Sequence, residues 1–537
     1  MEILSIICVF SLISNAYSAQ VRVDPLVLID QGLVRGLKSS DANYSQFLGI
    51  PYAQVDLDNP FGAARHHPGF DEEIFNAYDD SIVCPQTVKS SMRSDSDAIE
   101  TLDCLRLNIY VPTIASSQNP LPVLVWFHGG NYVVGSANSY DPENLVRQGI
   151  VVVTVNYRLG PYGFMCLDVP NVPGNQGLKD QYEALTWVRR NIRAFGGNPY
   201  NVTIGGQSAG AGSALLHLYS NKDKLFSKVI AQSGTPHKPG SFVNADVEVA
   251  KQLALHLGFN TTDTSEALEF LKGTHHKLVS GAAADLDLKL RPCKERSFSG
   301  VENFIVTDPF SLSNAKKVKG TPILIGQTSN EYYGTNANED DEYYKSNIFY
   351  ETLKESFYLN NEQMEEAALI AQHFYIGDEP SSRDLSFELD NFSTDFLMKH
   401  PIERTTSNLL KENAKPVYQY EFSYVGDSEK DDAVHNEELK YLFNFGGTVE
   451  ANEKNKLLIA RITKLWANFV KYGDPTPVVD DILPVKWKSA GKDYRPYMII
   501  DADLKLEYRI NKESMAFWDL FYKAYGHYNI YTRDCSF

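Results

Sequence analysis

The stretch VTIGGQSAGAGSALLHLY, residues 202–219, places one hydroxyl, Ser208, among several glycines. β-Branched residues precede it and leucines follow it, so we expect a strand to become a helix at this serine. Residues 206–210 match G-x-S-x-G, the tight turn that exposes a nucleophilic hydroxyl. In a chain of 537 residues this pattern arises by chance on the order of 0.2 times, so a purely structural glycine turn is the alternative.

A serine hydroxyl becomes a nucleophile only when a base accepts its proton and an acid orients that base. Glu331 follows the apolar run 321–327, and His435 lies in a polar stretch further along the chain. The order Ser, Glu, His is the one expected after G-x-S-x-G, although eleven other histidines compete for the role of base. The glycine-rich stretch 127–131 (FHGGN) offers consecutive N–H groups to a developing oxyanion.

These residues need a framework that brings them together. Apolar runs rich in Val, Ile and aromatic residues predict strands buried on both faces, at 121–128, 150–157, 201–206, 228–234, 321–327 and 417–424. Residues 177–192 have apolar positions at helical spacing and predict a crossover helix. Strands alternating with helices predict a doubly wound α/β fold. We interpret 338–380 as a helical insertion over the sheet edge, and 19–537 as one large domain.

Composition limits the location and partners of the protein. The net charge of −18 is spread along the chain, which argues against nucleic acid or an anionic membrane surface as partner. Residues 1–18 read as a signal peptide, because the apolar run 3–13 is too short to span a bilayer and small residues follow it. The start has Glu2 and no basic residue, so a buried N-terminal strand is the alternative. No later segment is apolar enough to anchor the chain in a membrane.

Four sequons fit secretion. Asn43, Asn260 and Asn391 are candidate glycosylation sites. Asn201 directly precedes a predicted buried strand, so we expect it to stay unmodified.

Further motifs extend over nearly the whole chain: FLGIPYA (47–53), DCLRLNIYVP (103–112), GNQGLKDQYEAL (174–185), TSNE (328–331) and HNEELKYLF (435–443). Together with HGGN and GGQSAG they resemble the type-B carboxylesterase and cholinesterase family of α/β-hydrolases. The residues GQSAG, HGGN and NPFGAARHHPGF (59–70) are most similar to secreted insect esterases of the juvenile-hormone, pheromone and odorant-degrading groups. The resemblance implies the α/β-hydrolase fold, a large and mostly parallel twisted sheet with helices on both faces and around an active-site gorge.

The resemblance also assigns roles. It implies Ser208 as nucleophile, His435 as general base and Glu331 as the carboxylate that orients it. The implied oxyanion hole consists of the N–H groups of three residues, Gly130, Asn131 and Ala209. Neither a metal nor an organic cofactor is implied, and the protein is expected to be a monomer or homodimer.

The cysteines are assigned in the same way. The resemblance implies a disulfide between Cys84 and Cys104. The places of the family's second disulfide hold Phe259 and Phe270. We therefore expect Cys166 and Cys293 to be free buried thiols, and Cys535 to be a candidate for an intersubunit link.

Several positions depart from the family pattern. Asn131 replaces the usual Gly, Gln207 replaces the usual Glu before the serine, and Asp432 stands where Gly is common. We favour a solvated Asp432 over one that acts on His435. Residues 85–103, inside the first disulfide loop, contain no aromatic side chain to hold a quaternary ammonium, which argues against choline esters.

Leu288 and Leu290 align with the family's acyl-pocket region. They are interpreted either as apolar pocket walls or as ordinary core. The sequence thus predicts a secreted carboxylesterase that hydrolyses small hydrophobic esters (pheromone, odorant, hormone or xenobiotic) through a serine acyl-enzyme. The alternatives are a juvenile-hormone-selective esterase and a weakly catalytic, cholinesterase-like binding or adhesion protein.

Overall fold

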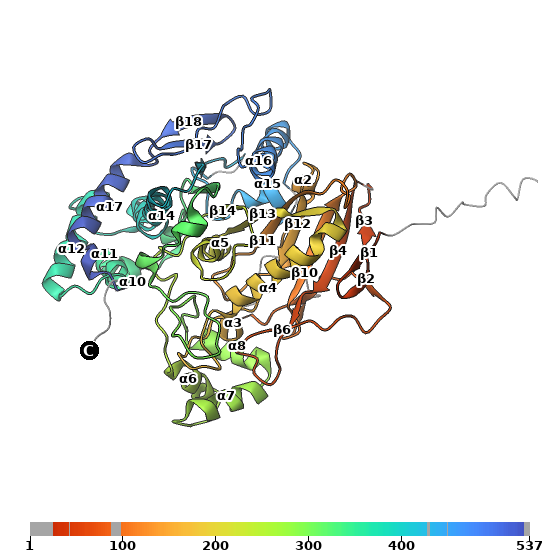
Figure 1. Ribbon diagram of the computed structural model, residues 1–537. Helices are drawn as coiled ribbons and strands as arrows, with labels where there is room; N and C mark the ends of the chain where they lie inside the picture. Colours follow the sequence, from red (N-terminus) through yellow and green to blue (C-terminus); the bar gives the residue numbers. More distant parts are fainter. Residues whose placement is uncertain (1–24, 42, 87–97, 427–429, 448, 531–537) are drawn as a thin grey trace, which may run out of the picture.

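The computed structural model of the protein describes residues 25–41, 43–86, 98–426, 430–447 and 449–530. An eleven-stranded twisted sheet forms its centre (Figure 1). From one edge to the other, its strands are β18 (Leu504–Tyr508), β17 (Pro496–Ile500), β16 (Val417–Phe422), β15 (Ile323–Thr328), β14 (Lys228–Gln232), β13 (Gly197–Gln207), β11 (Leu121–Phe127), β12 (Val151–Val155), β10 (Arg106–Pro112), β4 (Tyr44–Pro51) and β3 (Leu37–Lys38).

The middle of this sheet is parallel. All neighbouring strands from β17 to β12 run in the same direction, whereas β18 at one edge and β10, β4 and β3 at the other pair antiparallel. Each of the six apolar runs expected to be a strand belongs to this sheet. The predicted α/β fold is therefore confirmed, and the carboxyl ends of the parallel strands meet at one edge.

Helices cover both faces of the sheet because successive side chains of a strand point to opposite sides. In β11, Val125 packs in one hydrophobic core and Trp126 in the other. The first core includes residues of α4 (Gln176–Asn191), the expected crossover helix, and of α5 (Ala209–Tyr219). The second includes residues of α15 (Leu439–Phe443) and α16 (Glu453–Tyr472). Burial on both faces explains why these strands lack alternating polarity.

The segment 338–380 is helical, as expected. It contains α10 (Asp341–Lys345), α11 (Ile348–Lys354) and α12 (Asn361–Tyr375). These helices lie beside α17 (Lys512–Tyr525) at the left of Figure 1, and α11 and α12 share with α13 (Ser386–Thr394) and α17 a third hydrophobic cluster around the fully buried Trp518. The insertion is thus held by the C-terminal helix.

The remaining elements are shorter. Two small helices follow sheet strands, α2 (Glu143–Val146) and α3 (Gly160–Phe164), and α9 (Ala315–Val318) precedes β15. Three helices, α6 (Glu248–His256), α7 (Thr264–Gly273) and α8 (His276–Asp285), lie together at the bottom of Figure 1. Helix α14 (His400–Lys411) leads into β16. Short strands pair outside the main sheet, namely β1 (Leu26–Ile29), β2 (Gly32–Arg35), β7 (Ile74–Asn76), β5 (Ala53–Gln54), β6 (Arg65–His66), β8 (Ile82–Val83) and β9 (Ile99–Glu100).

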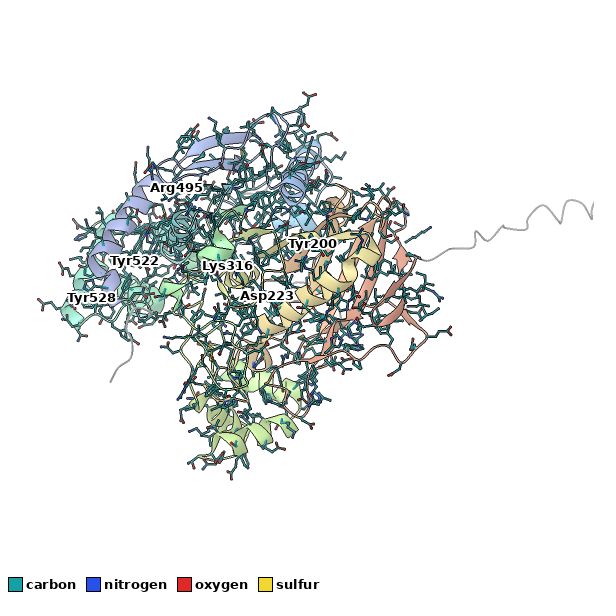
Figure 2. The ribbon with its side chains drawn as sticks, in the orientation of Figure 1. Tyr200, Asp223, Lys316, Arg495, Tyr522 and Tyr528 are labelled. Carbon is teal, nitrogen blue, oxygen red and sulfur yellow. A yellow bond between two sulfur atoms is a disulfide. The ribbon has the colours of Figure 1, made fainter. Side chains whose placement is uncertain are left out.

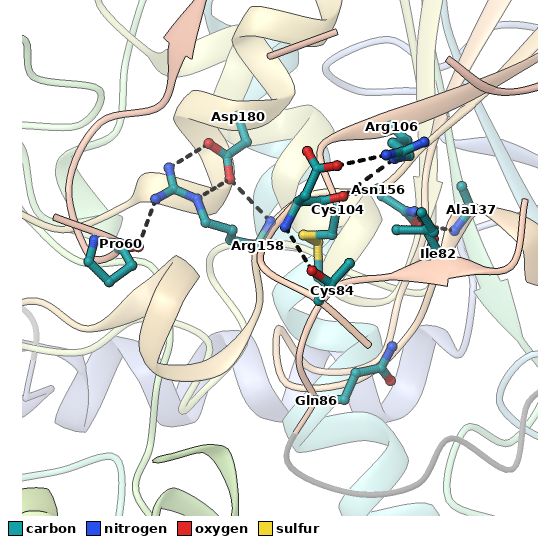
Figure 3. The surroundings of a disulfide bond; sticks show 12 residues. Pro60, Ile82, Cys84, Gln86, Cys104, Arg106, Ala137, Asn156, Arg158 and Asp180 are labelled. Atoms are coloured by element: carbon teal, nitrogen blue, oxygen red, sulfur yellow. Dashed lines mark hydrogen bonds and ion pairs between the residues drawn. A yellow bond between two sulfur atoms is a disulfide. The ribbon is translucent and has the colours of Figure 1, made fainter. Parts of the chain in front are cut away.

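The expected disulfide between Cys84 and Cys104 is present (Figure 3). Beside it, the fully buried Arg158 and Asp180 form an ion pair, with Arg158 Nη2 2.6 Å from Asp180 Oδ1. Gln86, two residues after the first cysteine, exchanges two hydrogen bonds with the backbone of Gly135, at 2.9 and 3.0 Å. The disulfide region is therefore attached to the loop that follows HGGN.

The prediction of free thiols at Cys166 and Cys293 is wrong, because these residues form a second disulfide across 127 residues. A Cβ atom at Gly174, where φ is +108°, would lie 2.5 Å from Cys293 Sγ and 2.7 Å from Cys166 Sγ. Only glycine leaves room for the bond there. Asn175 exchanges two hydrogen bonds with the backbone of Cys293, at 2.8 and 2.9 Å. The pairing depends on contacts between distant segments, which no local pattern reveals.

Phe259 and Phe270 occupy the positions of a disulfide that is common in the family and that this chain lacks. Their rings are stacked, with centroids 4.7 Å apart and planes 9° from parallel. An aromatic pair contributes about 0.5–1.5 kcal/mol beyond the area it buries. It therefore joins α7 to the residues that follow α6 without a covalent bond.

Candidate active site

Ser208 lies in a strained turn between the last residue of β13 and the first residue of α5. Its φ of 57° and ψ of −121° are rarely adopted by residues with a side chain. A Cβ at Gly206 would lie 2.4 Å from the backbone of Gly210, and a Cβ at Gly210 would lie 2.0 Å from the carbonyl oxygen of Phe127. The glycines allow the turn to pass this close to β11, as the G-x-S-x-G pattern predicts.

Glu331 and His435 are in direct contact. Glu331 follows β15 and His435 precedes α15, and Nδ1 of His435 lies 2.5 Å from Oε2 of Glu331. The Glu331 side chain is fully buried, and its other oxygen accepts a hydrogen bond of 2.9 Å from the Thr328 amide. Burial acts to raise the pKa of Glu331, but the adjacent His435, the Ser233 side chain and the Thr328 amide together hold it below its ordinary value. The carboxylate is thus a charged acceptor that orients the imidazole.

The other imidazole nitrogen faces the serine turn. Nε2 of His435 lies 3.0 Å from Nε2 of Gln207, the residue directly before Ser208. Within the described residues, Ser208 Oγ forms no hydrogen bond. Glu331, His435 and the turn that carries Ser208 therefore lie together, with the Gln207 amide beside Nε2 of His435.

The HGGN stretch forms a turn that packs on this site. Gly130, Asn131 and Tyr132 have φ values of 101°, 57° and 64°. A Cβ at Gly129 would lie 3.3 Å from Cβ of Ser208, so the turn is in close contact with the serine. Among the described residues, the N–H groups of Gly130 and Asn131 donate to no acceptor. The N–H group of Ala209 has no intrahelical acceptor, because it opens α5. All three N–H groups are available to a ligand oxygen.

The structure adds a residue that the sequence reasoning missed. Glu438 is fully buried, and its Oε1 accepts a hydrogen bond of 2.9 Å from Gln232, which in turn accepts one of 2.7 Å from Trp466 Nε1. Burial and the charge of Glu331 raise the pKa of Glu438 to about 7. The sequence does contain a signal that could have found Glu438. It lies three residues after His435, at the start of an apolar helix pattern, where a carboxyl group must face the core.

Other expected site residues lie elsewhere or serve other contacts. Leu290 is 3% exposed and packs in the first core, and Leu288 packs against the same core. Asp432 is half-buried and makes no hydrogen bond or ion pair with His435 in the described part of the chain. Although burial acts to lower the pKa of Lys399, nearby carboxylates, Asp432 among them, hold it above its ordinary value.

The sequons differ in accessibility. Asn43 and Asn260 are exposed, whereas Asn391 is half-buried in α13 and accepts a hydrogen bond from Asn330 at 3.1 Å. Asn201 is half-buried and hydrogen-bonds Lys228 and the backbone of Lys471.

Some predictions concern residues outside the described ranges, namely the signal peptide at 1–18 and the intersubunit link at Cys535. No helix formed by the described residues is long and apolar enough to cross a membrane. In the same residues, no group of three His, Cys, Asp or Glu side chains is arranged to hold a metal ion.

The fold and this arrangement of residues define an α/β-hydrolase. A family model described as the carboxylesterase family matches residues 23–518. The chain therefore belongs to the carboxylesterase family and is a carboxylic-ester hydrolase.

Relatives of known name agree with this assignment. Esterase FE4 of Myzus persicae is 30% identical over 526 residues, covering 91% of each chain. Juvenile hormone esterase of Heliothis virescens is 30% identical over 515 residues, covering 87% of this chain and 88% of that protein. The crystal structure of juvenile hormone esterase from Manduca sexta with OTFP covalently attached is similar with a TM-score of 0.82, at 26% identity over 93% of this chain and 100% of that chain.

Proposed function

We propose that this carboxylesterase hydrolyses small hydrophobic esters through an acyl intermediate on Ser208. The observation that carries the proposal is the Glu331–His435 hydrogen bond of 2.5 Å beside the strained turn of Ser208. A turn needed only for the fold would not require a buried carboxylate and an imidazole next to it.

In the proposed mechanism, Ser208 Oγ attacks the ester carbonyl while His435 Nε2 accepts its proton. The protonated imidazole is stabilised by Glu331 through Nδ1. The oxyanion accepts hydrogen bonds from the N–H groups of Gly130, Asn131 and Ala209. His435 then gives the proton to the departing alcohol. A water molecule, deprotonated by His435, attacks the acyl group. His435 then gives this proton to Ser208 Oγ as the carboxylic acid is released.

The test compares hydrolysis of a p-nitrophenyl ester by the wild type and by Ser208→Ala. We expect the variant to lose several orders of magnitude in kcat. Because Ser208 has a positive φ, Ser208→Gly is a second variant that relieves backbone strain, and it should be equally inactive. Mass spectrometry of acid-quenched enzyme should find the acyl group on the peptide that contains Ser208. Equal background rates from all three proteins would refute the esterase mechanism and favour a protein that binds esters without turning them over.

A juvenile-hormone-selective esterase is the second candidate. The similarity to juvenile hormone esterases in both sequence and structure supports it. The similarity to Esterase FE4 of Myzus persicae supports the broader activity. The ratio of kcat/KM for juvenile hormone to that for short p-nitrophenyl esters separates the two. A selective enzyme should favour the hormone by orders of magnitude.

We further propose that the protein is secreted after removal of residues 1–18. Two disulfides among the described residues suit an oxidising compartment. Exposed Asn43 and Asn260 are the better glycosylation candidates. When the full chain is expressed in insect cells, the culture medium should contain protein that begins at Ala19. A chain lacking residues 1–18 should stay inside the cells.

A further inference from the structure

A basic cavity lies near the amino ends of the parallel strands, whereas Ser208 follows the carboxyl end of β13. It has a volume of about 500 Å³ and is bounded by α14, α17 and the residues just before β17. Lys492 and Arg495 of its lining precede the first residue of β17, at the edge where the parallel strands begin. Ser208 and Glu331 follow strand ends. The cavity is therefore separate from the site described above.

Cations dominate its lining. Arg404 and Lys411 come from one face of α14, and Lys492 and Arg495 come from the facing loop. Asp519 is the one carboxylate of the lining, and its Oδ1 lies 3.2 Å from Nε2 of His400. Lys411 and Lys492 are exposed and make no hydrogen bond or ion pair with any described residue. This local excess of positive charge occurs in a chain whose net charge is −18.

The two guanidinium groups are held in place. The Arg495 side chain is 10% exposed, and its Nη2 donates a hydrogen bond of 2.9 Å to Ser407 Oγ. Its nearest carboxylate, Glu403, lies 3.8 Å from Nη1, and neither Nη1 nor Nε has a hydrogen-bond acceptor in the described structure. Arg404 lies over the ring of Tyr522, with Cζ 4.3 Å from the ring centroid.

A buried guanidinium is unfavourable where it lacks an acceptor, as at Nη1 and Nε of Arg495 in the described structure. Desolvation lowers the pKa of Arg404, although Tyr522 and Asp519 counteract it. A buried donor without an acceptor destabilises the folded protein, and more so when it is charged. Guanidinium groups match tetrahedral oxyanions because their planar N–H pairs can bind two oxygens at once. An anion in the cavity would supply acceptors for Nη1 and Nε of Arg495.

We propose that this cavity binds a small tetrahedral oxyanion, free phosphate or sulfate or the monoester of either, through Arg404, Arg495, Lys411 and Lys492. Ser407 and Asn408 supply the neutral polar groups of the lining. The cavity is larger than one such ion, so a monoester with a small organic group fits as well as the free anion. The inference does not depend on the proposed ester substrates.

Calorimetric titration with inorganic phosphate, inorganic sulfate and phenyl phosphate tests the site, with sodium chloride at equal ionic strength as reference. We expect saturable binding of at least one of the three to the wild type. Tighter binding of phenyl phosphate identifies a monoester as the ligand, and tighter binding of the free ions identifies the ion.

Variants locate the site. The double variant Lys411→Gln with Lys492→Gln changes only exposed side chains, so folding is preserved, and the affinity should fall at least about tenfold because two charged donors are lost. Arg495→Lys keeps the charge but removes the planar pair of N–H donors, and should also weaken binding.

The matched control is Lys316→Gln, which removes an exposed cation of α9 outside the cavity and should bind as the wild type does (Figure 2). A wild-type response equal to that of chloride, or one affinity shared by all four proteins, would overturn the proposal. Ester hydrolysis should be the same in the double variant as in the wild type.

Discussion

Nε2 of His435 lies 3.0 Å from the side-chain amide nitrogen of Gln207, while Nδ1 of the same ring contacts Glu331. An amide N–H that points at Nε2 requires a lone pair there, so this arrangement fits a neutral imidazole with its proton on Nδ1. The same lone pair must accept the proton of Ser208 in the proposed mechanism. Gln207 therefore holds the ring in the tautomer that the base needs, and must release Nε2 when substrate binds.

Gln207→Glu should shift the acid limb of the kcat/KM profile to higher pH. A carboxylate this close to Nε2 would stabilise the protonated ring, and opposite charges at such distances shift titrations by about 1–3 pH units. We expect activity at pH 6 to fall about tenfold or more, with recovery above pH 8. Measuring kcat/KM from pH 5 to pH 9 checks this.

Gln207→Met is the matched control, because it has a similar length but neither charge nor amide. Its acid limb should stay close to that of the wild type. If Gln207→Glu and Gln207→Met gave the same pH profile, a charge effect on His435 would be excluded.

Glu438→Gln should make the free energy of unfolding less dependent on pH. The pKa of Glu438 is raised from its ordinary 4.5 to about 7 in the folded protein. Its contribution to stability is therefore fully present below pH 4.5 and is lost as the pH rises through 7, by roughly 3 kcal/mol for a shift of this size. The neutral amide has no such titration.

Urea unfolding of both proteins at pH 5 and pH 8 measures this difference. The free energy of unfolding of the variant minus that of the wild type should be larger at pH 8 than at pH 5. Any loss of stability that the substitution causes equally at both pH values cancels in this comparison. A stability difference that is the same at both pH values would show that Glu438 does not titrate in this range.

Gln86→Ala should lower kcat/KM about tenfold. The variant loses both hydrogen bonds to Gly135 and so loosens the loop that carries the proposed oxyanion donors. Gln363→Ala is a matched control, since this half-buried glutamine also bonds backbone, in the N-terminal cap of α12 far along the chain. Steady-state kinetics should show a loss for Gln86→Ala and none for Gln363→Ala. Equal kinetics in the two variants would contradict a role for Gln86 in positioning this loop.

Removing the Cys166–Cys293 bond with serine at both positions should lower the free energy of unfolding by about 2–5 kcal/mol, because a long loop is no longer closed in the unfolded chain. Alkylation of the denatured, unreduced wild type should leave both residues unlabelled. Labelling of either one would contradict the pairing.

Gly174→Ala probes the same bond from the backbone. The added methyl group would lie within 2.7 Å of both sulfur atoms, so this variant should be destabilised more than Gly300→Ala. Gly300 also has a positive φ, of +76°, but a Cβ there meets nothing within 4 Å. Thermal unfolding of the two variants separates the contact from the backbone strain that both share.

The amino-acid sequence by itself determined the parts that local patterns encode. Val- and Ile-rich runs became the parallel strands, because burial on both faces requires apolar residues at every position. The glycines around Ser208 specified the strained turn, because no larger residue fits there. The order of Ser208, Glu331 and His435, together with the family resemblance, predicted a triad, and Glu331 and His435 are in contact beside the turn of Ser208.

Only the tertiary structure decided which distant groups meet. The disulfide between Cys166 and Cys293, the contact of Gln207 with His435, the burial of Glu438 and the cations around Arg495 all depend on how separate segments pack. Periodicity along a chain records which residues are buried, but not which buried surface faces which. That choice is made by the complementary shapes and charges of elements far apart in the sequence.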